Sequence, residues 1–160
     1  MDYELKSKRA REVFDTFCKS LDADNWNYRK DEEKLTVIYN QIGKDIKMNC
    51  YFSIDTDRQV IRFLSAMPIN FSGEKIADAV LACCFINNTI AYGGFDTHLE
   101  TGEVFYRMSY GFCGCLLGED FFRRMRSIAT MVVDEFNDKF VDLYVGKIRP
   151  EEILSRNDNK

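Results

Sequence analysis

Three stretches of the chain repeat apolar residues at the three- and four-residue spacing of an amphipathic helix. The first covers residues 3–21, and the second follows Ser72, whose hydroxyl is predicted to cap it. This second stretch is apolar on nearly every side, which predicts packing on more than one side. The third and longest begins at Glu119 and is ended by Gly146. Its apolar arc is wider than one sheet face covers, so we expect a dimer interface formed by Val132, Phe136 and Phe140.

Six shorter stretches alternate apolar and polar residues, which is the period of a half-buried β-strand. They occupy residues 26–28, 35–42, 46–54, 60–67, 95–99 and 103–112. The polar segment 30–34 separates the first two, and Thr101-Gly102 separates the last two. Pro68 closes the fourth stretch, because proline has no N–H to donate to a sheet.

The order of these elements predicts the fold class. A helix, three or four strands, a second helix, two strands and a long helix indicate an α+β fold with a mostly antiparallel sheet of about five to six strands, flanked by three helices. We expect one domain over residues 1–148. Residues 149–160 are predicted to form a C-terminal tail with a short helical turn at Pro150 and a loose end at 157–160.

Composition and charge narrow the classes of partner. The chain has 160 residues, of which 46% are hydrophobic, and this is enough for one compact domain with a core. The 22 Lys and Arg residues against 26 Asp and Glu residues give a net charge of −4. Such a chain has no basic field to attract phosphates, so we expect no nucleic acid partner.

Two further patterns bear on the compartment. The first nine residues mix both charges, as a signal peptide does not, and no uncharged apolar run approaches the ~18 residues that span a bilayer. We therefore expect a cytoplasmic protein with no membrane partner. In a reducing cytosol its six cysteines are expected to remain thiols.

Cysteine and histidine are the residues that could carry chemistry. Adjacent helical residues such as Cys83 and Cys84 point about 100° apart, and Cys113 and Cys115 lack the two-residue gap of a zinc knuckle. The only histidine, His98, has no evident partner for nucleophilic catalysis. The pattern therefore predicts no catalytic residue, no metal, no cofactor and no enzyme activity. A redox role for Cys113 and Cys115 stays open, because glycines surround them.

The strands carry more aromatic rings than one sheet face needs. Because only one face of the sheet meets the helices, some rings must lie on the other face or at an interface. The candidates for contact with a partner are Tyr39, Tyr51, Phe105 and Tyr106. The alternative is that both faces are covered within the monomer or dimer.

The chain resembles the YbjN family of bacterial proteins, whose domain is built like the class I type III secretion chaperones. The resemblance covers roughly residues 21–140. It rests on WNY at residues 26–28, FLSAMP at 63–68, NNTIAYGGFD at 87–96 and GEVFYR at 102–107. It implies no enzymatic activity, and it implies the behaviour of the related chaperones, which bind an extended segment of another protein as dimers.

Two functional hypotheses follow. The first is a non-enzymatic, chaperone-like or regulatory homodimer that binds a protein or peptide through its sheet. The alternative is a small-molecule- or metal-responsive regulator with a pocket near the second helix and the Cys-x-Cys loop, contacted by Cys83, Cys84 or Cys113.

Overall fold

The fold was analysed in a computed structural model, which describes residues 2–115 and 117–155. The loose end predicted at 157–160 lies outside the described residues.

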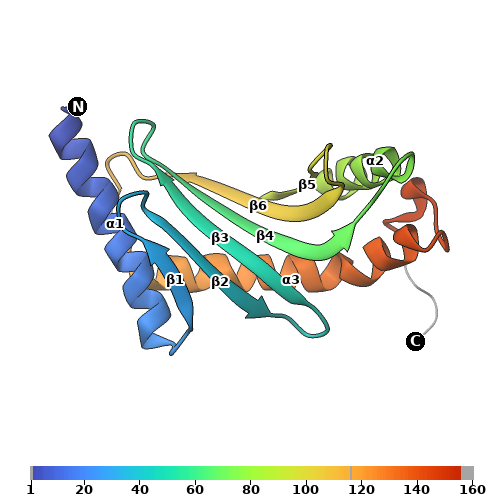
Figure 1. The fold of residues 1–160 in the computed structure, drawn as a ribbon, viewed down its shortest axis with the longest axis horizontal. Coiled ribbons are helices and arrows are strands. Elements are labelled where there is room, and N and C mark those ends of the chain that lie inside the picture. The colour runs from blue at the N-terminus through green and yellow to red at the C-terminus, as the bar shows by residue number, and fades with distance from the viewer. Residues whose placement is uncertain (1, 116, 156–160) are drawn as a thin grey trace.

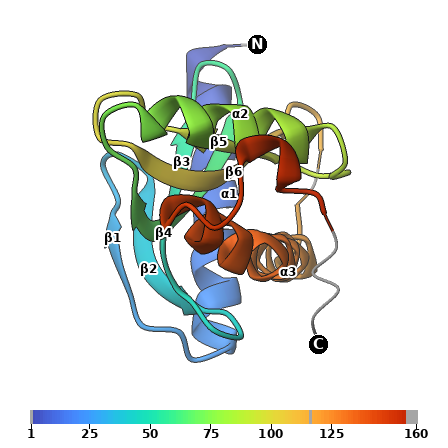
Figure 2. The same cartoon turned by 90° about the vertical axis from the view of Figure 1, so that its right-hand side faces the viewer.

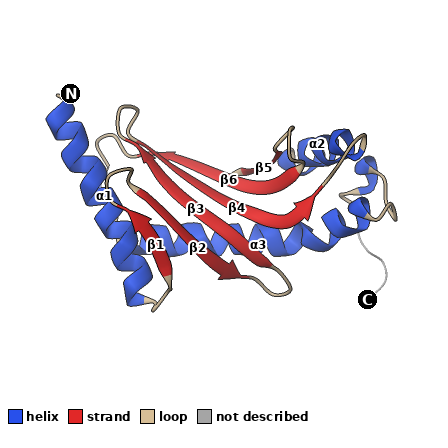
Figure 3. Ribbon diagram, in the orientation of Figure 1, coloured by secondary structure: helices blue, strands red, loops and turns tan. Residues whose placement is uncertain are grey.

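One antiparallel sheet of six strands forms the centre of the molecule, in the order β1-β2-β3-β4-β6-β5 (Figures 1 and 3). The strands are β1 (Tyr28–Asp31), β2 (Thr36–Ile42), β3 (Lys47–Asp55), β4 (Val60–Asn70), β5 (Gly94–Thr97) and β6 (Glu103–Gly111). Neighbours in sequence pair through short turns, except where the second helix separates β4 from β5. β6 then returns beside β4 and leaves β5 at the edge.

Three α-helices surround the sheet unevenly. They are α1 (Tyr3–Ala23), α2 (Lys75–Asn87) and α3 (Glu119–Tyr144), followed by the short 3-10 helix η1 (Pro150–Glu152). α3 runs the length of one sheet face, α1 lies across one end, and α2 lies beside β5 at the other end (Figures 1 and 2). The predicted α+β class and element order are confirmed.

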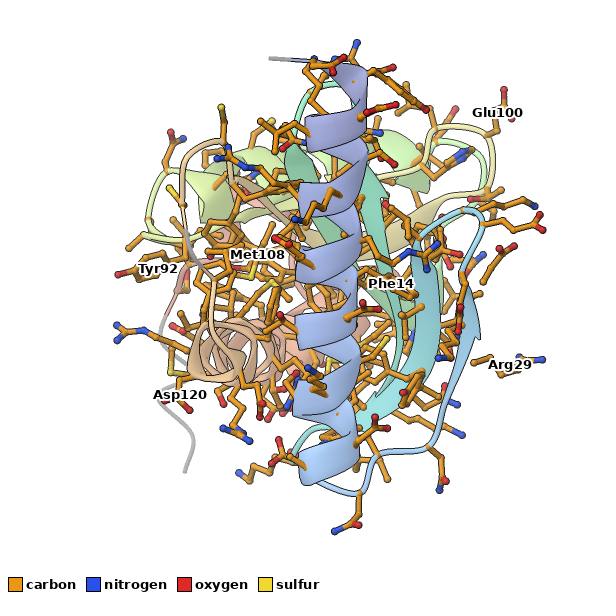
Figure 4. All side chains as sticks on the ribbon, turned by 90° about the vertical axis from the view of Figure 1, so that its left-hand side faces the viewer. Phe14, Arg29, Tyr92, Glu100, Met108 and Asp120 are labelled. Carbon is orange, nitrogen blue, oxygen red and sulfur yellow. The ribbon has the colours of Figure 1, made fainter. Side chains whose placement is uncertain are left out.

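The core lies between α3, α1 and one face of the sheet. Phe17 of α1 stacks on Phe52 of β3 with ring centroids 3.8 Å apart, and Phe122 of α3 meets Phe17 edge-on at 5.3 Å. Phe14 points from α1 toward the sheet (Figure 4). Phe52 lies at an inward position of β3 and Phe17 on the apolar stripe of α1, as the sequence periodicity predicts.

Two strand boundaries differ from the prediction. β1 begins and ends later than 26–28, because the carboxylate of Asp31 accepts the backbone N–H groups of Glu33 and Lys34 at 3.1 and 3.0 Å and places the turn after Asp31. β4 continues through Pro68 to Asn70, because the pairing with β6 is irregular between Ala66 and Asn70 and demands no N–H from the proline.

The second helix also differs from its prediction. It begins at Lys75, and Ser72 contributes its carbonyl oxygen to the Lys75 N–H at 3.2 Å, with no side-chain cap. Leu81 is 46% exposed, and the buried residues Ala79, Ala82, Cys83 and Ile86 form one face. α2 contacts β5, η1 and α3, whereas the side that carries Leu81 and Cys84 stays exposed.

The C-terminal segment belongs to the packed fold. η1 packs on α2, and both Pro150 and Ile153 are buried. The short helical turn predicted at Pro150 is therefore part of the packed structure, and the domain boundary at 148 stays a prediction.

Candidate functional site

The face of the sheet opposite α3 is the main surface that no described helix covers. Arg29 of β1 points outward on this side, away from the helices (Figure 4). Along β3 the inward residues are buried, whereas the outward Lys47, Asn49 and Tyr51 are exposed. We call this surface the open face.

An apolar strip crosses the open face over four strands. Ile38 of β2 pairs with Tyr51 of β3, and Tyr51 pairs with Leu64 of β4. Two residues after Leu64 on the same strand, Ala66 pairs with Phe105 of β6. We call these five residues the apolar strip. The side chains of Ile38 and Tyr51 are 47% and 37% exposed, which is unusual for neighbouring large apolar groups on a sheet.

The apolar strip borders a shallow groove of about 270 Å³. Asn49 and Glu103 add polar groups to its lining. Such a surface, apolar in the centre and polar at the edge, has the composition of a protein interface.

Ion pairs flank the strip on both sides. Near one end of the strands, Asp55 accepts from the guanidinium groups of Arg58 and Arg62 at 3.0 and 3.1 Å. The pKa of the Asp55 carboxyl lies below its ordinary value, mainly because the backbone N–H of Arg58 donates to it. On the other side, Arg107 of β6 pairs with Asp96 of β5 at 3.0 Å. The rim therefore offers both charges.

The predicted partner-binding residues divide between the two faces. Tyr51 and Phe105 belong to the apolar strip. Tyr39 and Tyr106 point into the core, where they are 3% and 0% exposed, and therefore cannot contact a partner. Burial raises the pKa of both phenols. Tyr106 follows Phe105 directly, so the two must lie on opposite faces of β6.

The strip includes three residues that are not aromatic and were not predicted as partner contacts, namely Ile38, Leu64 and Ala66. The sequence pattern could have identified them, because each is an apolar residue at a position that alternates with the buried residues of its strand. Which strands meet side by side depends on the register, which the sequence did not give.

The predicted dimer residues lie inside the monomer. Val132, Phe136 and Phe140 are 6%, 3% and 0% exposed, and the rings of Phe136 and Phe140 meet Phe95 of β5 at 5.8 and 5.2 Å. One chain thus covers this part of the apolar arc by itself. The homodimer stays a prediction, but these residues do not present a surface for it.

The cysteines do not gather in one pocket. Cys83 is buried in α2, where its thiol lies 3.5 Å from the Thr97 hydroxyl and burial raises its pKa to about 11. Its neighbour Cys84 is exposed. Cys113 and Cys115 lie at the opposite end of the sheet, next to α1 (Figure 1). The predicted shared pocket of α2 and the Cys-x-Cys loop is therefore not formed.

Over residues 2–115 and 117–155, no three His, Cys, Asp or Glu side chains are grouped as metal ligands would be. Within the same ranges, every helix is too short or too polar to cross a membrane.

Comparison with solved structures identifies the fold. No family model matches the chain, and no curated protein is similar enough in sequence to count as a relative. The structure of YbjN from E. coli, described as a candidate transcription regulator, superposes with a TM-score of 0.56, and the match covers 78% of this chain and 91% of that one. The fold is YbjN-like. Because YbjN shares 12% sequence identity with this chain, the likeness shows the fold alone.

Proposed function

We propose that this protein is a non-enzymatic regulatory module, acting as a homodimer, that binds a segment of a different protein on its open face. The observation that carries the proposal is the apolar strip of Ile38, Tyr51, Leu64, Ala66 and Phe105, which spans four strands without a helix above it in the described part of the chain. Apolar groups in such a row gain free energy when a partner removes them from water.

The surroundings of the strip define the chemistry of the partner. Apolar side chains would cover the strip, and flanking residues of both signs would meet Arg62 with Asp55 on one side and Arg107 with Asp96 on the other. The YbjN-like fold supports a regulatory role by analogy, since YbjN is described as a candidate transcription regulator.

Photo-crosslinking from the open face tests this proposal. A benzophenone amino acid is placed at position 51 or 105 of the full chain in its native cells. We expect both positions to capture the same protein, because Tyr51 and Phe105 belong to one strip. The control position is Leu99, which is 69% exposed but lies in the turn between β5 and β6. It should capture nothing at a comparable level.

The captured protein is then purified and titrated against variants. Tyr51→Asp should weaken its binding at least about tenfold, because a carboxylate at the centre of an apolar contact loses its hydration. Leu99→Asp should leave the affinity unchanged. Equal adducts at all three positions, or an adduct with a second copy of this chain, would contradict the proposed partner.

A further inference from the structure

The turn between β6 and α3 holds two exposed thiols, Cys113 and Cys115. The backbone N–H of Cys115 donates to the carbonyl oxygen of Phe112 at 3.2 Å, which closes a four-residue turn. Gly114 occupies its third position with φ of +74°, a conformation that glycine adopts without strain. The two cysteines therefore flank the one residue of the turn that has no side chain.

The turn brings the two thiols toward each other. In an extended chain, residues two apart are separated by roughly 7 Å, which exceeds the Cα–Cα distance of about 4.4–6.8 Å in a disulfide. A turn shortens that separation. The Cys115 sulfur lies 3.8 Å from the Cys113 carbonyl oxygen, so its thiol is directed back over Cys113. Apart from the adjacent residues Cys113 and Cys115, no described atom lies within 4 Å of the position that a Cβ would take on Gly114, which leaves room for the turn to adjust.

The other thiols differ from this pair. Cys18, Cys50 and Cys83 are buried, and burial raises the pKa of each to about 11, so little thiolate forms at neutral pH. Cys84 is exposed on α2, at the opposite end of the sheet from Cys113 and Cys115 (Figure 1). It serves as an internal control for an exposed thiol whose adjacent cysteine, Cys83, is buried.

Cys115 also borders a cavity that can admit a small reactant. The cavity has a volume of about 450 Å³ and lies between the turn and α1, where Arg9, Glu12 and Thr16 line it. Its size suits a peptide-sized thiol compound.

We propose that Cys113 and Cys115 form a reversible disulfide by exchange with a low-molecular-weight disulfide such as oxidised glutathione. One protein thiolate attacks a glutathione sulfur, forms a mixed disulfide and releases the first glutathione thiol. The second protein thiolate then attacks the protein sulfur of that mixed disulfide and releases the second glutathione thiol. Two electrons pass from the protein sulfurs to glutathione, and the two protein thiol protons end on the glutathione thiols.

The test treats the full-length protein with oxidised glutathione, blocks the remaining thiols and analyses tryptic peptides by mass. Trypsin leaves Cys113 and Cys115 in one peptide, since no Lys or Arg lies between them. We expect this peptide to lose two hydrogen atoms and to resist alkylation, whereas Cys84 becomes alkylated or carries glutathione. Excess reduced glutathione should restore both thiols.

Variants separate the pair from single thiols. In Cys113→Ser, the exchange should stop at the first step and leave glutathione on Cys115. Cys84→Ser should leave the Cys113–Cys115 product unchanged. Three results would overturn the proposal. The native protein could carry glutathione on both Cys113 and Cys115, it could link to a second chain through them, or it could leave both thiols open to alkylation.

Discussion

Arg126 of α3 is a buried cation that joins α3 to α1 and to the segment between α1 and β1. Its side chain is 4% exposed, and its guanidinium group donates to the Asp24 carboxylate at 2.6 Å and to the Ser20 hydroxyl at 2.7 Å. The guanidinium carbon lies 5.7 Å from the centre of the Trp26 ring. A buried charge is tolerated only with such partners, because water no longer solvates it.

Loss of the Asp24 carboxylate is predicted to destabilise the fold more than loss of a solvent-exposed carboxylate that also pairs with an arginine. Asp24→Ala leaves Arg126 without its counter-ion and should lower the free energy of unfolding by about 2 kcal/mol, the range for a hydrogen bond to a charged group. Urea denaturation measures this. Asp120→Ala is the matched control, since Asp120 pairs with Arg123 while 97% exposed, and it should cause no measurable loss. Equal effects of both changes would contradict a structural role for the buried pair.

At the scale of elements, the end of α2 protects the edge of the sheet. The Asn87 amide donates to the Phe95 carbonyl oxygen at 2.9 Å and accepts the Phe95 N–H at 2.7 Å. The Thr97 N–H also faces the free edge of β5, and it donates to the Asp96 carboxylate at 3.1 Å. Side chains thus satisfy groups that an edge strand would otherwise offer to another chain.

Removal of the Asn87 amide is predicted to loosen β5. In Asn87→Ala the Phe95 N–H loses its acceptor, so its hydrogen exchange should become about tenfold faster, which corresponds to roughly one hydrogen bond. Exchange followed by NMR measures this. The control is Asn88→Ala, because the Asn88 side-chain amide donates to the Cys84 carbonyl oxygen and not to β5. In this variant the exchange at Phe95 should not change. Unchanged exchange in Asn87→Ala would show that another group protects the strand.

At the scale of the whole molecule, self-association must use an exposed surface. The sequence places the dimer at Phe136, but this ring packs against Phe95, so Phe136→Asp is expected to unfold the monomer. α3 also carries Met131, which is 62% exposed on its outer side. This is the side of α3 left for a second chain.

We predict a homodimer that uses the outer side of α3 and leaves the open face free. Light scattering should give about twice the chain mass of 18.7 kDa, and Met131→Asp should reduce it to that of one chain. Tyr51→Asp should keep the dimer, because Tyr51 lies on the other side of the sheet. A native protein that has the mass of one chain at all concentrations would refute the dimer, and dissociation by Tyr51→Asp would move the interface to the open face.

The sequence by itself determined the order of the elements and which residues of each strand share a face. A period of two fixes that Phe52 and Tyr51 point to opposite sides, and a helical period places Phe17 on the apolar stripe of its helix. It also places Ile38 on the face of its strand opposite Val37 and Tyr39.

Only the tertiary structure decided which of these residues meet. The apolar strip depends on the register that sets Tyr51 beside Ile38 and Leu64, and register is a property of paired strands. The burial of Phe136 depends on how α3 packs on β5, and the separation of Cys83 from Cys113 depends on the path of the chain across the sheet. These are distances between segments far apart in sequence, and local periodicity carries no information about them.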